Sequence, residues 1–567
     1  MSDTAEASAA EAAMMRAEWQ HVVFAAEPRR LALLELRAPW PLRPVRISVL
    51  RNHTVETSLS SLRGFLAYAG YVPEVVLSGY DDALSTAPVA AADVHLVWLD
   101  LSHYANAEID GLWSWLADRV RFLRSALTGP IVVVDAGPAL AGFERFNASL
   151  REAIDGLPDA HVFPLSAAVP PAVDGASVEE RASSTGTALS GRDAVALCQH
   201  LGLCWIPALL QPRLKAIVLD LDNTVVGGVL AEDGAANVRT DGTYARLRER
   251  LLALHQEGVL LALVSKNDVR DVDGLFAQRP ELEALRHALV AVEAGWQDKA
   301  SSVRAIAARL HVGTDSLLIV DDNPGEIAAM ASALPSARFL WAEDPGSTER
   351  ALTLYPGLLE LRHDAAASAR MSDLQAAERR AAAAQTAIDP AAYVASLQVQ
   401  IRLRADDHTD RTRLSELSRK TNQFNTSLAR FGEVEVDDYL TRADRRVVSV
   451  RLRDRLSDSG LVGAVFARRD GGRVVIDEIA ISCRALGRSL EPAMLAAALR
   501  GVAEGLDAQT LLVPFVAGPR NEPAHAWLAA FADSRQGGDD EYLLSTASLE
   551  ARVPRLPIDI QWENGGG

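Results

Sequence analysis

The sequence predicts a multidomain α/β protein in which two units built on parallel sheets precede a smaller α+β module. With 567 residues the chain is too long for one hydrophobic core, because single cores stop growing at about 250–300 residues. Apolar strand-like runs first alternate with amphipathic helical patterns, which indicates parallel sheets covered by helices. Farther along the chain, strand-like runs follow one another directly and then meet a helix, which is typical of an α+β module.

The composition is that of a globular protein. Hydrophobic residues make up 49% of the chain and charged residues 23%, which excludes a chain that is disordered throughout. No apolar run reaches the roughly 18 residues of a transmembrane helix, and the Ala/Glu-rich start lacks the pattern of an export signal. The three cysteines, Cys198, Cys204 and Cys483, are too few for a disulfide framework. We therefore expect a cytoplasmic protein without a membrane partner.

The formal net charge of −18 disfavours binding to nucleic acid. The charge is uneven, however, since residues 396–500 hold 19 Lys and Arg against 15 Asp and Glu. This mildly basic stretch could meet an acidic partner, or it could be the ordinary variation of a solvated surface.

The first α/β unit is expected at residues 41–210, after an Ala-rich helical lead-in at residues 1–40. Its predicted strands are residues 45–50, 72–79, 94–101 and 130–137. Amphipathic helical patterns lie between them, so the sheet should be parallel and covered on both faces. The unit should end in the loop at residues 167–191, which is rich in Pro, Ser, Ala and Gly.

The second α/β unit is expected at residues 211–362, followed by a linking segment and the last module. The predicted strands of this unit are residues 215–222, 259–266, 287–294, 316–323 and 336–344. Residues 363–392 lack a wide apolar stripe, so they should form a surface or bridging helix that ends before Pro390. In the module at residues 393–555 the predicted strands are LQVQIRLR, RVVSVRLRDR, LVGAVFARRD and RVVIDEIAIS, and the helix PAMLAAALRGVAEGL follows them.

A pair of carboxylates marks the end of the first strand of the second unit. Asp220 and Asp222 follow the apolar run KAIVL, and ligands of open α/β sheets bind beyond such strand ends. Burying two like charges together is costly unless a cation joins them. Because carboxylate oxygens suit a hard divalent ion, this pair predicts a Mg²⁺ site.

Three further polar groups follow the pair along the chain. Ser265 closes the strand LLALVS, Lys299 opens a helix, and Asp321 and Asp322 end the strand LLIV. This order of groups resembles that of the HAD superfamily phosphotransferases. The resemblance implies a Rossmann-like parallel-sheet domain in which Asp220 attacks phosphorus and Asp222 acts as general acid and base.

The same resemblance implies the remaining roles at this site. Thr224, Ser265 and Lys299 would hold the phosphoryl oxygens. Mg²⁺ would be bound by Asp220, Asp222, Asp321 and Asp322. The ion would neutralise negative charge in the transition state.

One branch of this superfamily, the FkbH-like proteins, is similar to this chain over roughly residues 40–550. The stretch DLDNTVVGGVLAEDG resembles the family pattern DLDNTLWGGVIGEDG, and ISCRALGRSLE resembles MSCRVLGRGVE. The sequences KND after Ser265, W-x-x-K-A around Lys299, DDNP, KTNQFN and LSDSGLVGA are similar too. Val226 departs from the pattern, since the family usually has Trp there, and this position is expected to border the phosphate pocket.

The FkbH-like resemblance implies a bifunctional acyltransferase and phosphatase. Such proteins take a glyceryl unit from 1,3-bisphosphoglycerate, a phosphorylated three-carbon acyl donor, and remove its second phosphate. They load the unit as a thioester on the phosphopantetheine of an acyl carrier protein, for polyketide-type biosynthesis.

The turn after the last predicted strand resembles the R/Q-x-x-G-x-G/A pantetheine loop of GNAT acyltransferases. It reads Arg484-Ala485-Leu486-Gly487-Arg488-Ser489, and a strand-to-helix turn offers N–H groups to a phosphate. Arg484, Gly487 and Arg488 would bind the pantetheine phosphate.

Cys483, just before this turn, would accept the acyl group as a thiolate. Spacing alone favours a packing role for this thiol, and the family resemblance favours catalysis. Asn422 and Asn425 in KTNQFN would line the acyl site, or they would form a polar turn. Cys198 and Cys204 lie in the amphipathic segment CQHLGLCWIP and are expected to pack.

The first unit resembles the SGNH-hydrolase-like domain that precedes the HAD domain in this family. Its first strand ends in Leu50-Arg51-Asn52-His53-Thr54, without the serine of a G-D-S nucleophile block. We therefore expect a scaffold or a docking domain for the carrier protein.

Two other functions stay open at the level of the sequence. The chain could be a Mg²⁺-dependent phosphatase whose C-terminal module binds a carrier protein without catalysis. It could also be a non-catalytic platform for other enzymes, against which the pair Asp220 and Asp222 argues.

Overall fold

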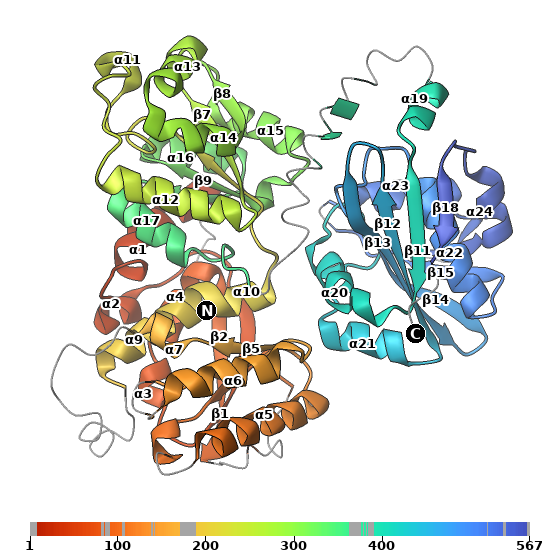
Figure 1. Cartoon of the computed structure of the whole chain (residues 1–567), viewed down its shortest axis with the longest axis horizontal. Coiled ribbons are helices and arrows are strands. Elements are labelled where there is room, and N and C mark those ends of the chain that lie inside the picture. The colour runs from red at the N-terminus through yellow and green to blue at the C-terminus, as the bar shows by residue number, and fades with distance from the viewer. Residues whose placement is uncertain are drawn as a thin grey trace. The chain divides into compact units, whose positions relative to one another are not determined.

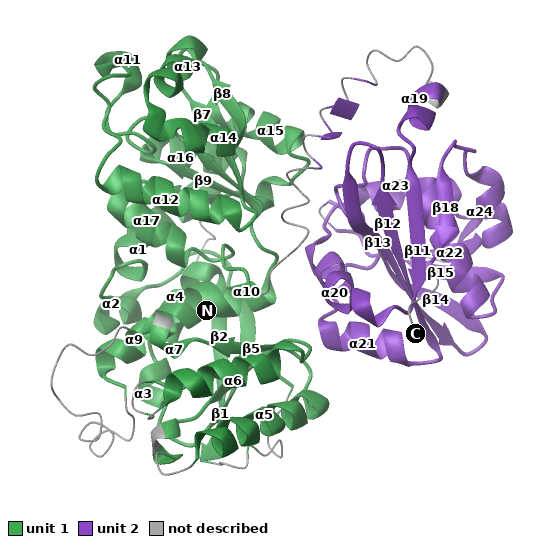
Figure 2. Ribbon diagram, viewed as in Figure 1, with its two compact units in different colours: residues 1–363 green, residues 364–567 purple. Residues whose placement is uncertain are grey.

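The computed structural model describes most of the chain and divides it into two compact units, residues 1–363 and 364–567 (Figures 1 and 2). The described residues are 8–80, 84, 91–104, 108–137, 140, 142–169, 189–361, 373, 376–377, 379–380, 383, 390–518, 520–536 and 540–563. Unit 1 holds two parallel five-stranded sheets and unit 2 one mixed eight-stranded sheet, which confirms the predicted α/β class.

The first sheet of unit 1 has the strand order β2-β1-β3-β4-β5, with every pairing parallel. Its strands are β1 (Arg43–Arg51), β2 (Tyr71–Tyr80), β3 (Val94–Trp98), β4 (Ile131–Val134) and β5 (Ala160–Phe163). β3 and β4 are buried along their whole length, as expected for central strands of a covered parallel sheet. The four predicted strands are present, whereas β5 was not predicted.

Helices cover this sheet and join it to the next one. They are α1 (Ala9–Val23), α2 (Arg30–Glu35), α3 (Glu56–Leu59), α4 (Leu62–Ala69), η1 (Leu101–Tyr104), α5 (Ile109–Ala126), α6 (Phe143–Asp155), α7 (Leu165–Ala168), α9 (Gly191–His200), η2 (Leu201–Trp205) and α10 (Ile206–Leu210). α5 and α6 share one core with β1, β3 and β4. α1 is more than a lead-in, because it contacts α4 beside the first sheet and α16 beside the second.

The continuous helical run Gly191–Leu210 is, among the described residues, long and apolar enough by length and composition to cross a membrane. Of this segment 67% is buried inside unit 1, as in a core helix of a globular protein. Cys198 and Cys204 lie within it, and burial raises the pKa of each thiol to about 12. Both thiols donate to backbone carbonyls, which confirms their packing role.

The second sheet of unit 1 has the order β10-β9-β6-β7-β8, again with every pairing parallel. Its strands are β6 (Ala216–Leu219), β7 (Leu260–Ser265), β8 (Leu289–Ala294), β9 (Leu317–Asp321) and β10 (Arg338–Trp341). All five were predicted, and each is shorter than its apolar run. β6 lies at the centre, where the strand order reverses, so ligands are expected beyond its carboxyl end.

Helices surround the second sheet: α11 (Leu230–Asp233), α12 (Thr243–Gln256), α13 (Val269–Gln278), η3 (Pro280–Leu282), α14 (Glu283–Ala288), α15 (Lys299–Arg309), η4 (Thr314–Ser316), α16 (Pro324–Ala333) and α17 (Pro345–Leu354). α12 packs against α17, and α15 packs against α16 and β7. Asp298, Asn323 and Asp344 cap α15, α16 and α17 through their side-chain oxygens. These caps fix where each helix begins at the edge that carries the candidate site.

Unit 2 contains the sheet β16-β17-β15-β14-β13-β12-β11-β18. Its strands are β11 (Gln400–Ala405), β12 (Arg445–Arg453), β13 (Asp458–Asp470), β14 (Arg473–Ile481), β15 (Thr510–Pro514), β16 (Ser534–Gln536), β17 (Glu541–Ser545) and β18 (Asp559–Trp562). β11 to β14 pair antiparallel as predicted. β14 and β15 run parallel and pair over only two residues each, so the sheet opens beyond Val475.

The helices of unit 2 are α19 (Pro390–Ser396), η5 (His408–Asp410), α20 (Arg411–Lys420), α21 (Glu433–Thr441), α22 (Glu491–Gly505), α23 (Glu522–Phe531) and α24 (Thr546–Arg552). α22 shares one hydrophobic core with the strands, and α20 and α21 share another. Separate cores of this kind place the two groups of helices on opposite faces of the sheet.

The predicted surface helix at residues 363–392 lies largely outside the described residues. Three side chains that are described there, Asp373, Ala376 and Arg380, are buried within unit 2. These three residues are helical, as the expected surface or bridging helix requires, but their side chains do not lie at the surface. The sequence argument looked for an apolar stripe, whereas Arg380 binds Asp454 of unit 2 by an ion pair of 2.7 Å. The predicted loop at residues 167–191 also lies mostly outside the described residues.

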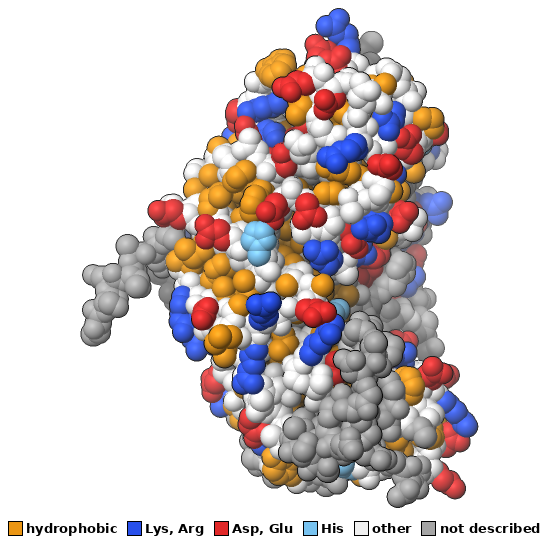
Figure 3. Space-filling model, turned by 90° about the vertical axis from the view of Figure 1, so that its left-hand side faces the viewer, with side chains coloured by type: hydrophobic (Ala, Val, Ile, Leu, Met, Phe, Trp, Pro, Cys, Tyr) orange, Lys and Arg blue, Asp and Glu red, His pale blue; other side chains and the backbone are white. Residues whose placement is uncertain are grey.

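The surface in Figure 3 carries acidic and basic side chains interspersed with hydrophobic ones. Among the described residues in this view, neither sign of charge forms a continuous field. The absence of a nucleic-acid partner thus stays a prediction from net charge.

Candidate active site

Four predicted residues meet at the carboxyl edge of the second sheet. Asp220 directly follows β6, Ser265 is the last residue of β7, Asp321 is the last residue of β9, and Lys299 is the first residue of α15. β9, β6 and β7 are neighbours in the sheet, so their ends bring these side chains to one place. Only Lys299 comes from a helix.

The ammonium group of Lys299 joins two of the carboxylates. Its Nζ lies 2.8 Å from Asp220 Oδ1 and 2.5 Å from Asp321 Oδ2, and all three side chains are at least nine-tenths buried. The second oxygen of Asp321 accepts the Asn323 N–H at 3.0 Å. Lys299 thus holds the carboxylates of Asp220 and Asp321 together at the ends of the paired strands β6 and β9.

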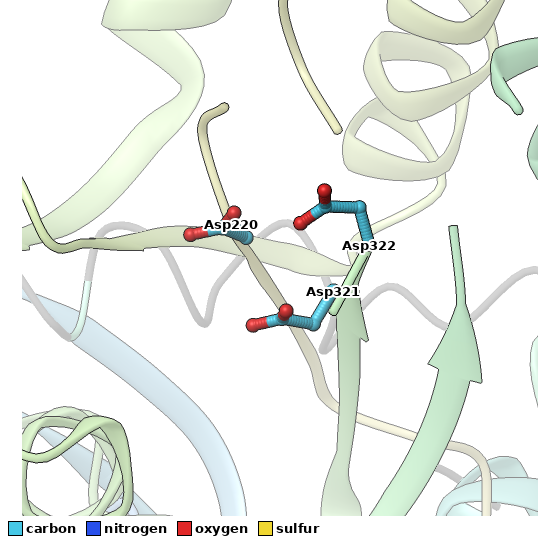
Figure 4. A group of neighbouring side chains, drawn as sticks. All are labelled: Asp220, Asp321 and Asp322. Atoms are coloured by element: carbon cyan, nitrogen blue, oxygen red, sulfur yellow. The ribbon is translucent and has the colours of Figure 1, made fainter. Parts of the chain in front are cut away.

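The site holds more negative charge than Lys299 neutralises. Asp220, Asp321 and Asp322 each offer an oxygen within 4.8 Å of the others, and the three carboxylates converge on one region (Figure 4). Burial raises the pKa of Asp220 to about 7, because the effect of Asp321 and Asp322 adds to that of burial while Lys299 opposes it. Burial and Asp321 likewise raise the pKa of Asp322.

The donor set of this site fits Mg²⁺. Three carboxyl groups converge there while one ammonium group, that of Lys299, pairs with two of them. Hard divalent cations prefer such oxygen ligands. Asp220, Asp321 and Asp322 are therefore the residues that would hold the ion.

Asp222, predicted as a fourth ligand, directs its carboxylate elsewhere. Its Oδ1 accepts the Leu230 N–H at 2.9 Å and its Oδ2 accepts Asn267 Nδ2 at 2.8 Å. The same Asn267 nitrogen donates to Ser265 Oγ at 2.9 Å. Asp222 is thus held by Leu230 and Asn267, and its own metal role stays a prediction.

Asn267 is a site residue that the sequence argument did not assign. It is completely buried, and its Oδ1 has no hydrogen-bond partner among the described residues. The hydroxyl of Thr224, also buried, is likewise without one. These two polar atoms are available to a ligand, and the signal for Asn267 was its place two residues after the strand-end Ser265.

Val226 differs from its sequence-based expectation. Val226 lies next to Asp222 through a β-bridge, but its side chain is completely buried in the apolar core. It therefore does not line an open pocket. Trp296, three residues before Lys299, is 76% exposed.

In the turn after β14, the predicted phosphate-binding groups contact other residues of unit 2. Arg488 lies 3.4 Å from Asp454 and 3.6 Å from Asp373, and Arg484 lies 3.6 Å from Asp373. The Gly487 N–H donates to Glu491 Oε1 at 2.6 Å. The positive φ of Gly487, +74°, favours glycine at this point of the turn.

The other predicted residues of unit 2 lie near this turn or behind it. Cys483 is half-buried in the turn itself, and α22 begins only at Glu491. Asn425 is completely buried, with its Nδ2 donating to Thr421 O and its Oδ1 accepting from Asn521. Asn422 accepts a hydrogen bond from Arg430 at 2.8 Å.

The first sheet carries a separate polar group at its carboxyl edge. Asn52 braces the strand ends by accepting the Asp100 N–H at 2.7 Å. Burial lowers the pKa of His53 to about 4, so this ring is neutral at pH 7. The hydroxyl of Thr54 pairs with Tyr80. These contacts are structural, and the scaffold role of this sheet stays a prediction.

Comparison with known proteins gives structural likeness only. No protein-family model matches the chain, and no protein of curated function matches its sequence. The N-terminal part of BF1531 from Bacteroides fragilis, which contains a phosphatase domain complexed with Mg, is similar at 19% identity, with a TM-score of 0.44 over 61% of this chain and 99% of that one.

Two further solved structures are similar over parts of the chain. A GNAT-family acetyltransferase from Streptococcus pneumoniae shares 18% identity over 25% of this chain and 96% of its own, with a TM-score of 0.19. A HAD-family hydrolase from Streptomyces avermitilis, described as putative, shares 19% identity over 26% of this chain and 95% of its own, with a TM-score of 0.19. The geometry described above therefore has to carry the functional assignment.

Replacing Lys299 by Met should destabilise unit 1 by about 3–5 kcal/mol, because removing one partner leaves buried charges uncompensated. Chemical denaturation of the full chain measures this loss. Addition of Mg²⁺ should recover more stability in this variant than in the wild type, since the ion replaces the lost positive charge. Lys266→Met is the control: Lys266 is 42% exposed in its pair with Glu326, so its loss should cost under about 1 kcal/mol. Equal losses in the two variants would contradict this account of Lys299.

Proposed function

We propose that unit 1 is a Mg²⁺-dependent phosphatase of the HAD type. The observation that carries this proposal is the arrangement of Asp220, Asp321 and Lys299 at the ends of β6 and β9, with Ser265 and Asp222 joined through Asn267. On this proposal, one edge of the sheet supplies a nucleophile, a general acid and base, and donors to the phosphate.

The residues of this edge divide the reaction between them. An oxygen of Asp220 attacks phosphorus, an O–P bond forms, and the bond from phosphorus to the alkoxy oxygen breaks. Asp222, held by Leu230 and Asn267, gives the leaving oxygen a proton and then takes one from the water that hydrolyses the aspartyl-phosphate. Thr224, Ser265 and Lys299 donate to the phosphoryl oxygens. When bound, Mg²⁺ supplies positive charge against the phosphoryl group.

We further infer that unit 2 transfers an acyl group to a carrier protein. The Cys483 thiolate attacks the acyl carbon of an acyl phosphate, an S–C bond forms, and the C–O bond breaks with departure of phosphate. The thiol of a carrier-bound phosphopantetheine then takes the acyl group and releases Cys483. With 1,3-bisphosphoglycerate as donor, unit 1 would remove the second phosphate to leave a glyceryl thioester, the product that the FkbH-like resemblance suggests.

A second candidate function has support in unit 2. Asn425 is fully buried, and Arg484, Gly487 and Arg488 are engaged by carboxylates of the same unit. A module of this kind could bind the carrier protein without catalysis, and the chain would then be a phosphatase alone.

Asp220→Asn should lower phosphate release from a phosphorylated three-carbon acid by about 10³-fold or more, because an amide does not attack phosphorus. Initial rates of phosphate release by the full chain measure this. Asp271→Asn, which changes an exposed aspartate of α13, is the control and should keep the wild-type rate. Phosphate release by the Asp220→Asn variant at the wild-type rate would show that Asp220 is not the nucleophile.

Removal of divalent cations with EDTA should stop phosphate release, and Mg²⁺ in excess should restore it. The physical reason is that Asp220, Asp321 and Asp322 carry charge that Lys299 alone does not balance. Isothermal titration of Mg²⁺ into the wild type and Asp322→Asn separates binding from turnover, and the variant should bind more weakly. Turnover that persists in EDTA would argue against a metal.

Cys483→Ser should abolish loading of a carrier protein while phosphate release in unit 1 continues. Intact-mass measurement after incubation with 1,3-bisphosphoglycerate should show a hydroxylamine-sensitive adduct on the wild type and none on the variant. Cys204→Ser is the matched control, since that thiol is buried in unit 1. Loading by the Cys483 variant at the wild-type rate would favour the phosphatase with a binding module.

A further inference from the structure

A polar cavity lies within unit 1, where α1 packs against helices of both sheets. α1 contacts α4 beside the first sheet and α16 beside the second (Figure 1). The cavity has a volume of about 260 Å³, and its lining includes the side chains of Arg16, Tyr68, Arg338 and Tyr355. None of the described residues that line it is an aspartate or a glutamate. The cavity is therefore electropositive.

The cavity is separate from the candidate active site. It touches α16 at Ala331, whereas Asp321 and Asp322 precede the other end of that helix. It touches β10 at Arg338, the first residue of the strand, whereas Trp341, the last residue, pairs with Asp321. The cavity and the metal-binding carboxylates thus lie at opposite ends of α16 and β10.

Arg16 brings a positive charge to the cavity without a carboxylate partner among the described residues. Its guanidinium group lies 4.1 Å from the centre of the Trp40 ring, and Trp40 Nε1 donates to a backbone carbonyl of α4 at 3.1 Å. Burial lowers the pKa of Arg16. The ionisable groups that act on it are Tyr68, Tyr355 and Arg338, and none of them is a carboxylate. A guanidinium group that rests on an aromatic face can direct its N–H groups to an anion.

Tyr68 brings a hydroxyl whose proton has no well-placed acceptor. The residue is 3% exposed, and its hydroxyl makes no hydrogen bond of ordinary geometry to a described residue. The hydroxyl of the neighbouring Tyr355 donates to Phe339 O at 3.2 Å, and the two tyrosine rings meet edge to face. Burial raises the pKa of Tyr68 well above its usual value, so the hydroxyl keeps its proton. A buried donor without an acceptor costs free energy, and an anion in the cavity would supply the acceptor.

Arg338 is oriented at the cavity by neutral partners. Its Nη1 donates to Pro356 O at 2.8 Å, and its Nη2 donates to Gln211 Oε1 at 2.9 Å. A guanidinium group has five N–H donors in one plane, so these two contacts leave further N–H groups for a ligand. Two arginines and a tyrosine hydroxyl thus offer hydrogen-bond donors to one cavity.

The charge and number of these donors favour a phosphate over a carboxylate. A phosphate monoester carries a charge of about −1.5 to −2 at pH 7, which matches two guanidinium groups, and it presents oxygens on several sides. A carboxylate carries one charge and has its two oxygens in one plane. The volume of about 260 Å³ is below the range of about 300–1,000 Å³ that is usual for drug-sized ligands, so the ligand is small.

We propose that this cavity binds a small organic phosphate, with Arg16, Arg338 and Tyr68 as donors to its phosphate group. The inference goes beyond the proposed function, because the cavity contains no residue of the Asp220 edge and binding there requires no Mg²⁺. It gives unit 1 a second phosphate site, at which no bond is formed or broken.

The first test measures binding of 3-phosphoglycerate to the full chain in EDTA by calorimetry. Without a metal ion, the carboxylates of Asp220, Asp321 and Asp322 repel a phosphate, so binding in EDTA reports the cavity. Arg16→Gln should weaken this binding about tenfold or more, because hydrogen bonds to charged groups are the strong ones. Arg121→Gln removes the same charge from an exposed residue of α5 and should bind like the wild type. Glycerate, which lacks the phosphate, should bind the wild type at least tenfold more weakly.

A second variant, Tyr68→Phe, removes one oxygen and keeps the ring. Binding of 3-phosphoglycerate should weaken about fivefold to tenfold. The midpoint of chemical denaturation should not fall, because the hydroxyl has no well-formed hydrogen bond in the free protein. Tyr71→Phe is the matched control: its hydroxyl donates to Gln211 Oε1 at 3.5 Å and lies outside the cavity lining, so this variant should bind like the wild type.

A measurement on the wild type alone does not depend on how the variants fold. Phenylglyoxal modifies guanidinium groups, and peptide mass mapping follows each arginine separately. Added 3-phosphoglycerate in EDTA should slow modification of Arg16 and Arg338 and leave that of Arg121 unchanged. An unchanged rate at Arg16 would overturn its role.

The outcomes distinguish this cavity from the proposed function. If the wild type does not bind 3-phosphoglycerate in EDTA, the cavity site is overturned, even if the chain releases phosphate with Mg²⁺. Equal binding by the wild type, Arg16→Gln and Tyr68→Phe overturns the location. Glycerate or inorganic phosphate that binds as tightly as 3-phosphoglycerate overturns the ligand class. Weaker binding confined to the two cavity variants supports the inference, even if Asp220 is not a nucleophile.

Discussion

The bridge from Lys299 to Asp220 and Asp321 is the interaction on which the candidate active site depends. Placing two carboxylates at the ends of adjacent buried strands would cost several kcal/mol per charge without a counter-charge in the same environment. Lys299 supplies this counter-charge as the first residue of α15. Asp298 caps that helix and so fixes where the helix begins. The remaining excess of carboxyl groups is the feature that supports the proposed Mg²⁺ site.

The sequence predicted the parallel sheets and most of this edge because the relevant information is local. An apolar run that ends in an acid or a serine marks both a buried strand and a residue at its carboxyl end, as at Asp220, Ser265 and Asp321. β5 escaped notice because its four residues, AHVF, form a short run that a histidine interrupts. The pairing of Asn267 with Asp222 could not be predicted, since it joins residues 45 positions apart.

In unit 2 the limits of sequence reasoning are sharper, because its polar contacts are distant in the chain. Glu478 of β14 is fully buried and accepts the N–H groups of Thr426, Ser427 and Ala429. This carboxylate anchors the turn that follows KTNQFN, so burial of Asn425 is a consequence of how that turn is held. A motif match identified the segment but gave no information on which of its side chains face outward. Likewise, no local pattern could place Asp373 beside Arg484.

The two clusters show the same principle with opposite signs. In unit 1, Asp220, Asp321 and Asp322 face one ammonium group, and in unit 2, three arginines beside the turn after β14 face Asp373 and Asp454. A buried cluster that the protein leaves unbalanced is costly. Each cluster contains a partial counter-charge. This is Lys299 among the carboxylates of unit 1 and Asp373 among the arginines of unit 2. They differ in origin: Lys299 is the first residue of α15 at the sheet edge, whereas Asp373 precedes α19 and comes from outside the sheet of unit 2.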